Sequence, residues 1–143
     1  MIDQKTAPYA ALLLRLSLGV MFIAHGLMKV LIFTPAGTVG YFESIGLPGV
    51  LAYATIFAEL AGGAALILGF ATRWVALALV PVLLGALIFG HAANGWAFTN
   101  AGGGWEYPLF LAMAALVQAL LGDGAYALNP FKAKQVSATA KLA

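Results

Sequence analysis

The sequence of 143 residues contains no cysteine. It therefore cannot form a disulfide, ligate an iron–sulfur cluster through thiolates or use a thiol nucleophile. Charge is also scarce, because Asp, Glu, Lys and Arg make up 8% of the chain, against about 25% in soluble domains. Hydrophobic residues make up 63%, which is more apolar surface than a soluble core of this size can bury. The composition predicts a membrane protein.

Four apolar stretches approach the length of about 20 residues that a membrane-spanning helix needs. We expect spans at residues 9–33, 50–70, 74–93 and 107–122. The first is read as a retained span, since its apolar run continues past Arg15 and no small-x-small cleavage site precedes a polar start. The predicted fold is all-α: one domain of residues 1–143, an antiparallel four-helix transmembrane bundle.

The joints between the spans carry ordinary helix-stop and helix-start signals. Thr34 and Pro35 fit an N-cap followed by proline in the first turn, and Gly46 fits a C-terminal cap. We expect a short amphipathic helix between them, lying at the membrane surface in the first outer loop. Residues 69–73 leave room for only a tight turn, so spans two and three should form a hairpin. Pro81 predicts a kink in span three.

The basic residues predict the orientation in the membrane. Four spans place both ends of the chain on one side, and that side collects Lys5, Arg73 and a basic tail at residues 131–143. Cytoplasmic loops carry an excess of Lys and Arg. We therefore expect both termini in the cytoplasm, a multi-pass protein of the plasma (inner) membrane, and a role for Arg73 in setting the topology.

Six ionisable side chains lie inside or at the rims of the apolar stretches: Arg15, His25, Lys29, Glu59, Arg73 and His91. A charge in mid-membrane costs several kcal/mol unless it is paired, hydrated or able to snorkel to the surface. Such residues usually mark a site or a partner.

Glu59 should find a basic partner inside the bundle. It lies nine residues into span two, and His25 lies eight residues from the end of span one, so the two share a similar depth. Arg15 is the competing partner, as one half of a structural ion pair with Glu59. A stripe of small residues on span two (Ala54, Ala58, Gly62, Ala65 and Gly69) indicates close helix packing beside Glu59.

The candidate ligand-binding residues are His25, Lys29, Glu59 and His91, in the outer half of the bundle, with Phe22 and Phe57 as lining aromatics. The alternatives are a hydrogen-bonded core role for His25, an interfacial role for His91 and a structural or snorkelling role for Lys29. No His or Glu spacing on one helix forms a specific metal motif, and no metal site is predicted. The pattern identifies no catalytic residue.

Several short motifs, taken in order along the chain, resemble the DoxX family of small four-helix membrane proteins. They are Leu14-Arg15-Leu16, His25-Gly26-Leu27-Met28-Lys29, Gly46-Leu47-Pro48, Glu59-Leu60-Ala61-Gly62-Gly63, Gly69-Phe70-Ala71-Thr72-Arg73, His91, and Gly103-Gly104-Trp105-Glu106-Tyr107-Pro108. The resemblance implies the fold, and only loosely a chemistry, since some members are subunits of quinone-reducing enzymes. The resemblance implies no set of catalytic residues.

Three functions are compatible with these features. The first is a quinone-interacting subunit of a membrane redox system, with electrons supplied by a membrane or peripheral partner because the chain has no recognisable cofactor motif. The second is a scaffold whose charges only hold the bundle together, and the third is a small-solute or proton pathway. Membrane lipids and self-association are further expected contacts. The basic residues indicate lipid headgroups and no nucleic acid.

Overall fold

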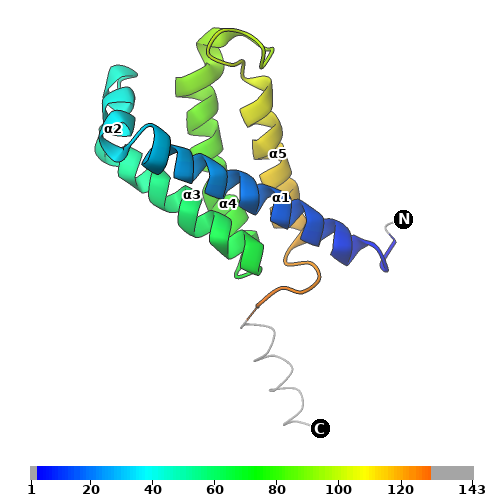
Figure 1. Ribbon diagram of the computed structural model, residues 1–143. Coiled ribbons are helices and arrows are strands. Elements are labelled where there is room, and N and C mark those ends of the chain that lie inside the picture. Colours follow the sequence, from blue (N-terminus) through cyan, green and yellow to red (C-terminus); the bar gives the residue numbers. More distant parts are fainter. Residues whose placement is uncertain (1–2, 130–143) are drawn as a thin grey trace.

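The computed structural model describes residues 3–129, and within them the chain is all-α (Figure 1). Its α-helices are α1 (Ala7–Leu27), α2 (Pro35–Ser44), α3 (Val50–Leu68), α4 (Thr72–Gly85) and α5 (Glu106–Leu121). Two π-helices, η1 (Met28–Ile32) and η2 (Ala86–His91), continue α1 and α4, and a 3₁₀ turn, η3 (Ala92–Asn94), follows. The basic tail predicted at residues 131–143 lies outside the described residues.

Within residues 3–129, three helical stretches are long and apolar enough to cross a membrane: Ala7–Ile32, Val50–Leu68 and Thr72–Asn94. The helix α5, with 16 residues, is apolar but shorter. The ends of all four helices agree with the predicted segments to within two residues. Long apolar runs with clear stop signals locate helices well, because both features act locally.

The helices pair as two hairpins. The first hairpin is formed by α1, η1, α2 and α3, and its long helices α1 and α3 pack on each other along their length. The second hairpin is formed by α4, η2, η3 and α5, and α4 packs mainly on α5. Figure 1 shows the two pairs crossing and then diverging toward the ends that carry α2 and the loop after η3. The expected tight turn between α3 and α4 is present, although each of these helices packs most extensively on another partner.

The closest approach between α1 and α3 passes through glycines. A Cβ atom added to Gly19 would lie 2.8 Å from the carbonyl oxygen of Gly63, and one added to Gly63 would lie 2.8 Å from that of Gly19. Of the predicted stripe, Gly62 lies against Leu79 of α4. The stripe therefore predicted close packing, but Gly63 beside it makes the close backbone contact with Gly19 of α1.

The predicted cap of α2 is confirmed. The Thr34 hydroxyl accepts a hydrogen bond from the Gly37 amide at 3.2 Å, Pro35 follows in the first turn, and Gly46 has the left-handed φ of 81° expected after a helix end. The turn between α3 and α4 uses left-handed residues in the same way, at Gly69 (φ 72°) and Ala71 (φ 46°). Pro81 lies inside α4, upstream of η2.

The apolar core joins both hairpins. It contains Leu18, Phe22, Leu66, Ala76, Leu79, Leu83, Ala112, Ala115 and Ala119. Many large apolar side chains nevertheless face outward, among them Leu13, Phe110 and Leu120. A soluble protein rarely exposes so much contiguous apolar surface.

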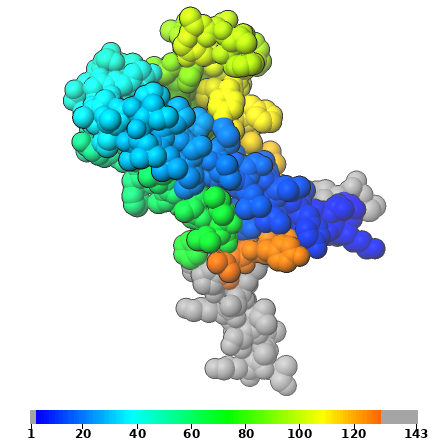
Figure 2. Space-filling view, viewed as in Figure 1, coloured from blue at the N-terminus to red at the C-terminus, as the bar shows by residue number. Residues whose placement is uncertain are grey.

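The residues after α5 turn back onto the first hairpin. We call residues 122–129 the closing segment. Its Ala125 amide donates to the carbonyl of Pro8 at 2.9 Å, and its Leu128 amide donates to that of Leu68 at 3.0 Å. Figure 2 shows this segment, in orange, against the blue start of α1 and the green end of α3. The closing segment thereby ties the end of the second hairpin to the first.

Candidate functional site

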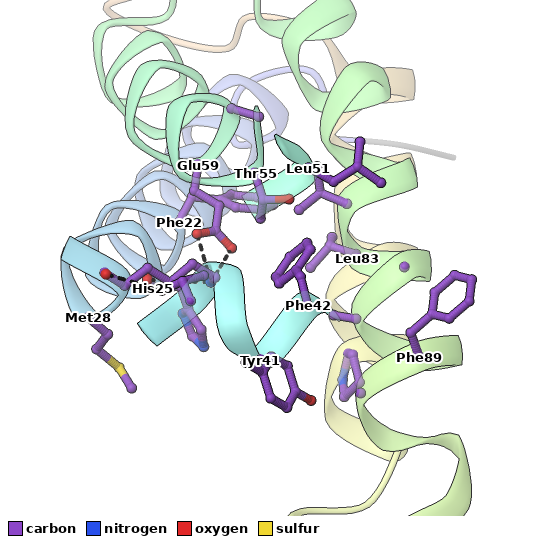
Figure 3. Close-up of a pocket in the computed structure, with 18 of the residues that line it drawn as sticks. Phe22, His25, Met28, Tyr41, Phe42, Leu51, Thr55, Glu59, Leu83 and Phe89 are labelled. Carbon is purple, nitrogen blue, oxygen red and sulfur yellow. Dashed lines mark hydrogen bonds and ion pairs between the residues drawn. The ribbon is translucent and has the colours of Figure 1, made fainter. Parts of the chain in front are cut away.

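An ion pair between Lys29 and Glu59 joins η1 to α3. The Lys29 Nζ atom lies 2.8 Å from both carboxylate oxygens of Glu59, and the two side chains are 19% and 7% exposed (Figure 3). Gly26 allows α1 to approach α3 at this level, because an added Cβ there would lie 2.7 Å from the Leu60 side chain and 3.3 Å from the Glu59 Cβ. The pair neutralises the charge of Glu59 inside the apolar part of the chain.

Arg15 does not pair with Glu59, and that expectation was wrong. Its Nη2 atom donates to the Ala125 carbonyl of the closing segment at 3.2 Å, and its side chain, 1% exposed, lies against Gly69. The antiparallel register explains the difference, since Gly26 lies level with Glu59 while Arg15 lies level with Gly69. Arg15 is about ten residues, or roughly 15 Å along the helix, from the level of Glu59.

His25 lies beside this ion pair. Its Nδ1 atom is 2.8 Å from the Met21 carbonyl, one turn earlier in α1, and its ring stacks on Tyr107 of α5 with centroids 6.3 Å apart. The Lys29 ammonium also reaches the His25 carbonyl at 3.5 Å. Lys29 thus lies between Glu59 and the backbone of His25, and the expected proximity of His25 and Glu59 is found with Lys29 joining them.

The π-helix η1 and the helix α2 hold Lys29 from the outer side. The single hydrogen of the Thr38 hydroxyl is shared between the carbonyls of Lys29, at 3.2 Å, and Thr34, at 2.9 Å. In a π-helix some carbonyls lack their ordinary α-helical partner, so a side-chain donor of this kind stabilises the segment. Short π-helical segments inside helices often occur at functional sites.

His91 lies in the second π-helix, η2, and is held by the loop that follows. Its Nδ1 atom is 2.9 Å from the Gly103 carbonyl. The Asn94 amide donates to the carbonyls of Gly102 and Gly103, both at 3.0 Å. Glu106, at the start of α5, accepts from the Phe98 amide at 2.8 Å. This loop therefore fixes His91 through backbone carbonyls and not through a charge.

All four candidate ligand-binding residues line one cavity of about 1090 Å³ between the hairpins: His25, Lys29, Glu59 and His91. Phe22 lines it as expected, whereas Phe57 is 73% exposed and lies outside it, so that expectation was wrong. Met28 and Phe33 line the cavity and are also exposed, which makes it a groove open to the exterior.

Sequence reasoning missed the part of the cavity wall that α2 and α5 supply. Figure 3 shows Tyr41 and Phe42 of α2 near His25 and Glu59, with Leu83 of α4 behind them. We expected α2 to lie at the membrane surface. The spacing of Phe42 and Ile45 marks an apolar face, and both residues line the cavity.

Arg73 lies apart from this cavity, exposed in the first turn of α4 and near Gly122. Across residues 3–129, no three His, Asp or Glu side chains come together as a set of metal ligands.

Comparison with known proteins identifies the family. The family model described as DoxX matches residues 10–92. "Putative oxidoreductase CatD" of Bacillus subtilis (strain 168) is 35% identical over 127 residues, covering 89% of this chain and 90% of that protein. "Inner membrane protein YqjF" of Escherichia coli (strain K12) is 29% identical over 131 residues, covering 88% of this chain and 94% of that protein.

A third relative, an uncharacterized protein of Haemophilus influenzae, is 35% identical over 127 residues, covering 88% of this chain and 92% of that protein. No solved structure matches the chain significantly. The family model covers more than half of the sequence, and relatives above 30% identity are matched over nearly their whole length. The chain belongs to the DoxX family.

Proposed function

We propose that this protein is an integral inner-membrane subunit of a redox system that binds a quinone, or a related lipid-soluble ligand, in the cavity between its hairpins. The observation that carries this proposal is the cavity itself. It combines an apolar lining with a small polar group formed by His25, the Lys29–Glu59 pair and His91.

The size and lining of the cavity suit such a ligand. Small-molecule sites typically have volumes of about 300–1,000 Å³, with apolar walls and a few placed polar groups. The cavity of about 1090 Å³ lies just above that range, which leaves room for a ring and part of an apolar tail. The polar residues would orient the ring, while Leu47, Leu51 and Phe42 would contact the tail.

The membrane arrangement that goes with this function has four spans and both termini in the cytoplasm. Three helices are long enough to cross, and α5 packs along α4 with Phe110, Met113 and Leu120 facing outward, as in a lipid-facing helix. Lys5 and Arg73 lie at the end of the molecule where both hairpins begin. Reporter fusions at residue 143 and within residues 94–105 should report opposite sides, and periplasmic activity at residue 143 would contradict this topology.

Sequence similarity to named relatives supports the redox role. A relative that is 35% identical carries the name of an oxidoreductase, and two others are named inner membrane proteins. We infer that electrons reach the ligand from a membrane or peripheral partner subunit, since the sequence contains no recognisable cofactor motif.

Thermal stabilisation of the purified protein tests the binding proposal. A short-chain quinone analogue should raise the melting temperature in proportion to the logarithm of its concentration above Kd, because it binds the folded state. Ala54→Phe would place a ring in the cavity and should abolish the shift. Ala64→Phe, on the exposed face of the same helix, is the matched control and should preserve it.

Two results would contradict the proposal. A wild-type melting curve that no quinone or related lipid shifts would favour the scaffold function, in which the polar residues only bond to each other. A shift of equal size in wild type and Ala54→Phe would place the ligand elsewhere on the protein.

A further inference from the structure

The backbone fixes which nitrogen of each cavity histidine carries hydrogen. The Nδ1 atoms of His25 and His91 lie 2.8 and 2.9 Å from carbonyl oxygens. A carbonyl only accepts, so each Nδ1 is the N–H donor, and in the neutral ring the lone pair is then on Nε2. Within residues 3–129 neither Nε2 has a hydrogen-bond partner. Both histidines line the cavity, one from each hairpin, so their neutral rings can supply two acceptors to a ligand there.

The cation of the cavity is already paired within the protein. The Lys29 ammonium has three hydrogens, and its neighbours are the two oxygens of Glu59 and the carbonyl of His25. An oxidised quinone ring has only carbonyl acceptors at its polar positions. Its oxygens would therefore face the Nε2 lone pairs of the two histidines, and the Lys29 ammonium is already paired with Glu59. The hydroxyls of Tyr41 and Thr55, which also line the cavity, can donate or accept and favour neither form.

From these two observations we propose that the cavity selects the reduced, dihydroxy form of its ligand, a quinol. The Nε2 atom of His25 accepts a hydrogen bond from one hydroxyl, and that of His91 accepts from the other. This inference rests on the proposed function, because it concerns the same cavity and the same class of ligand. It assigns the two histidines the task of distinguishing reduced from oxidised ligand, and it leaves the Lys29–Glu59 pair a positioning role.

Binding of three ligands with the same ring and tail tests this selectivity. They are a short-chain quinol, its quinone and its dimethyl ether, which keeps the shape of the quinol but has no hydroxyl hydrogen. Titration calorimetry under anaerobic conditions, with the full chain in detergent, gives the three Kd values. One hydrogen bond changes affinity up to about tenfold, so the quinol should bind about 10–100-fold more tightly than the ether or the quinone.

Single variants divide this preference between the two histidines. His25→Phe and His91→Phe should each reduce the quinol preference by about tenfold while leaving the Kd of the ether nearly unchanged. Glu43→Gln, on the exposed side of α2 and outside the cavity, is the control and should keep the full preference. The ligand series on wild-type protein needs no variant, so a variant that fails to fold does not affect the test.

The outcomes separate this inference from the function on which it rests. If the quinone or the ether binds as tightly as the quinol, the selectivity is refuted, and the proposed binding function stands. If none of the three ligands binds, the proposed function fails as well. Retention of the full preference in both histidine variants would also refute the assignment, since the acceptors would then lie elsewhere.

Discussion

In both hairpins a helix continues into a π-helical segment, and a histidine follows a Leu-Gly pair by six residues: Leu18-Gly19 and His25 in the first, Leu84-Gly85 and His91 in the second. The surroundings differ. In the first hairpin Gly19 touches the α3 backbone and an ion pair lies next to the histidine. In the second, an alanine Cβ at Gly85 would meet nothing within 4 Å, and a hydrogen-bonded loop holds the histidine. One wall of the cavity is thus held by close packing and charge, and the other by a loop.

The largest difference in stability between variants of the two hairpins should come from removing a carboxylate from each. Glu59→Ala leaves the partly buried Lys29 ammonium without its counter-charge, which costs about 3–5 kcal/mol of unfolding free energy. Glu106→Ala removes one hydrogen bond to an exposed amide and should cost about 1 kcal/mol or less. Denaturant unfolding in detergent measures both.

A double variant sharpens that test. Lys29→Met combined with Glu59→Leu removes both charges and should recover much of the loss, because replacing a buried pair by apolar side chains is often neutral. Equal stability of Glu59→Ala and Glu106→Ala would show that the ion pair contributes nothing special to the first hairpin.

Alanine substitution at the two matched glycines should change stability in opposite directions. Gly19→Ala places a methyl group 2.8 Å from the Gly63 carbonyl oxygen and 3.1 Å from the Ile67 amide nitrogen, so the helices must separate at a cost of about 1–3 kcal/mol. Gly85→Ala fills open space in a helix and should be neutral or stabilise by up to about 1 kcal/mol. Melting temperatures that fall alike in the two variants would contradict the difference in packing.

Removing the Asn94 side chain should loosen the loop of the second hairpin and leave the first hairpin unchanged. Asn94→Ala removes an amide whose two hydrogens are shared among three backbone carbonyls, and it should lower the local opening free energy by about 1–2 kcal/mol. Amide hydrogen exchange within residues 95–105 should then accelerate by about 5–30-fold, while the amides of α1 and α3 exchange as in wild type. Acceleration spread over both hairpins would mean that the loop supports the whole fold.

The smallest effect is expected at the start of α2 in the first hairpin, where Thr34 has a φ of 63° that a β-branched residue rarely adopts. Thr34→Ala keeps that backbone and loses the cap, at about 1 kcal/mol. Thr34→Gly loses the same cap but relieves the backbone, so it should be at least as stable as wild type to within about 0.5 kcal/mol. If the alanine variant is the more stable of the two in thermal melts, this account of Thr34 is wrong.

The sequence was a good guide to the helices and a poorer one to their partners. Apolar runs and caps act locally, so the ends of the long helices and the Thr34 cap were predictable. The partner of Glu59 was not, because residue counting resolves depth to about one helical turn, and a lysine side chain can span a turn. Lys29 also had an ordinary interpretation as a snorkelling residue.

Prediction of the cavity from the sequence had the same limit. The four polar residues that line it could be named from their place in the outer halves of the helices. The contribution of α2 could not, because the apolar face of a short helix fits a membrane surface as well as a protein groove. The pairing of the helices into two diverging hairpins, which creates the cavity, depends on contacts far apart in sequence and is not visible in any local pattern.

The closing segment has a consequence for the order of synthesis. Arg15 is made in the first helix, but the carbonyl that accepts its hydrogen bond belongs to a residue 110 positions later. At about 5–20 residues per second, a ribosome needs about 5–20 s to cover that distance. During this time the nascent first helix carries a guanidinium without its final partner, so it should remain shallow, with Arg15 near lipid headgroups or water. Final seating of α1 should therefore wait for the closing segment after α5, and chains truncated before residue 122 should leave α1 incompletely inserted.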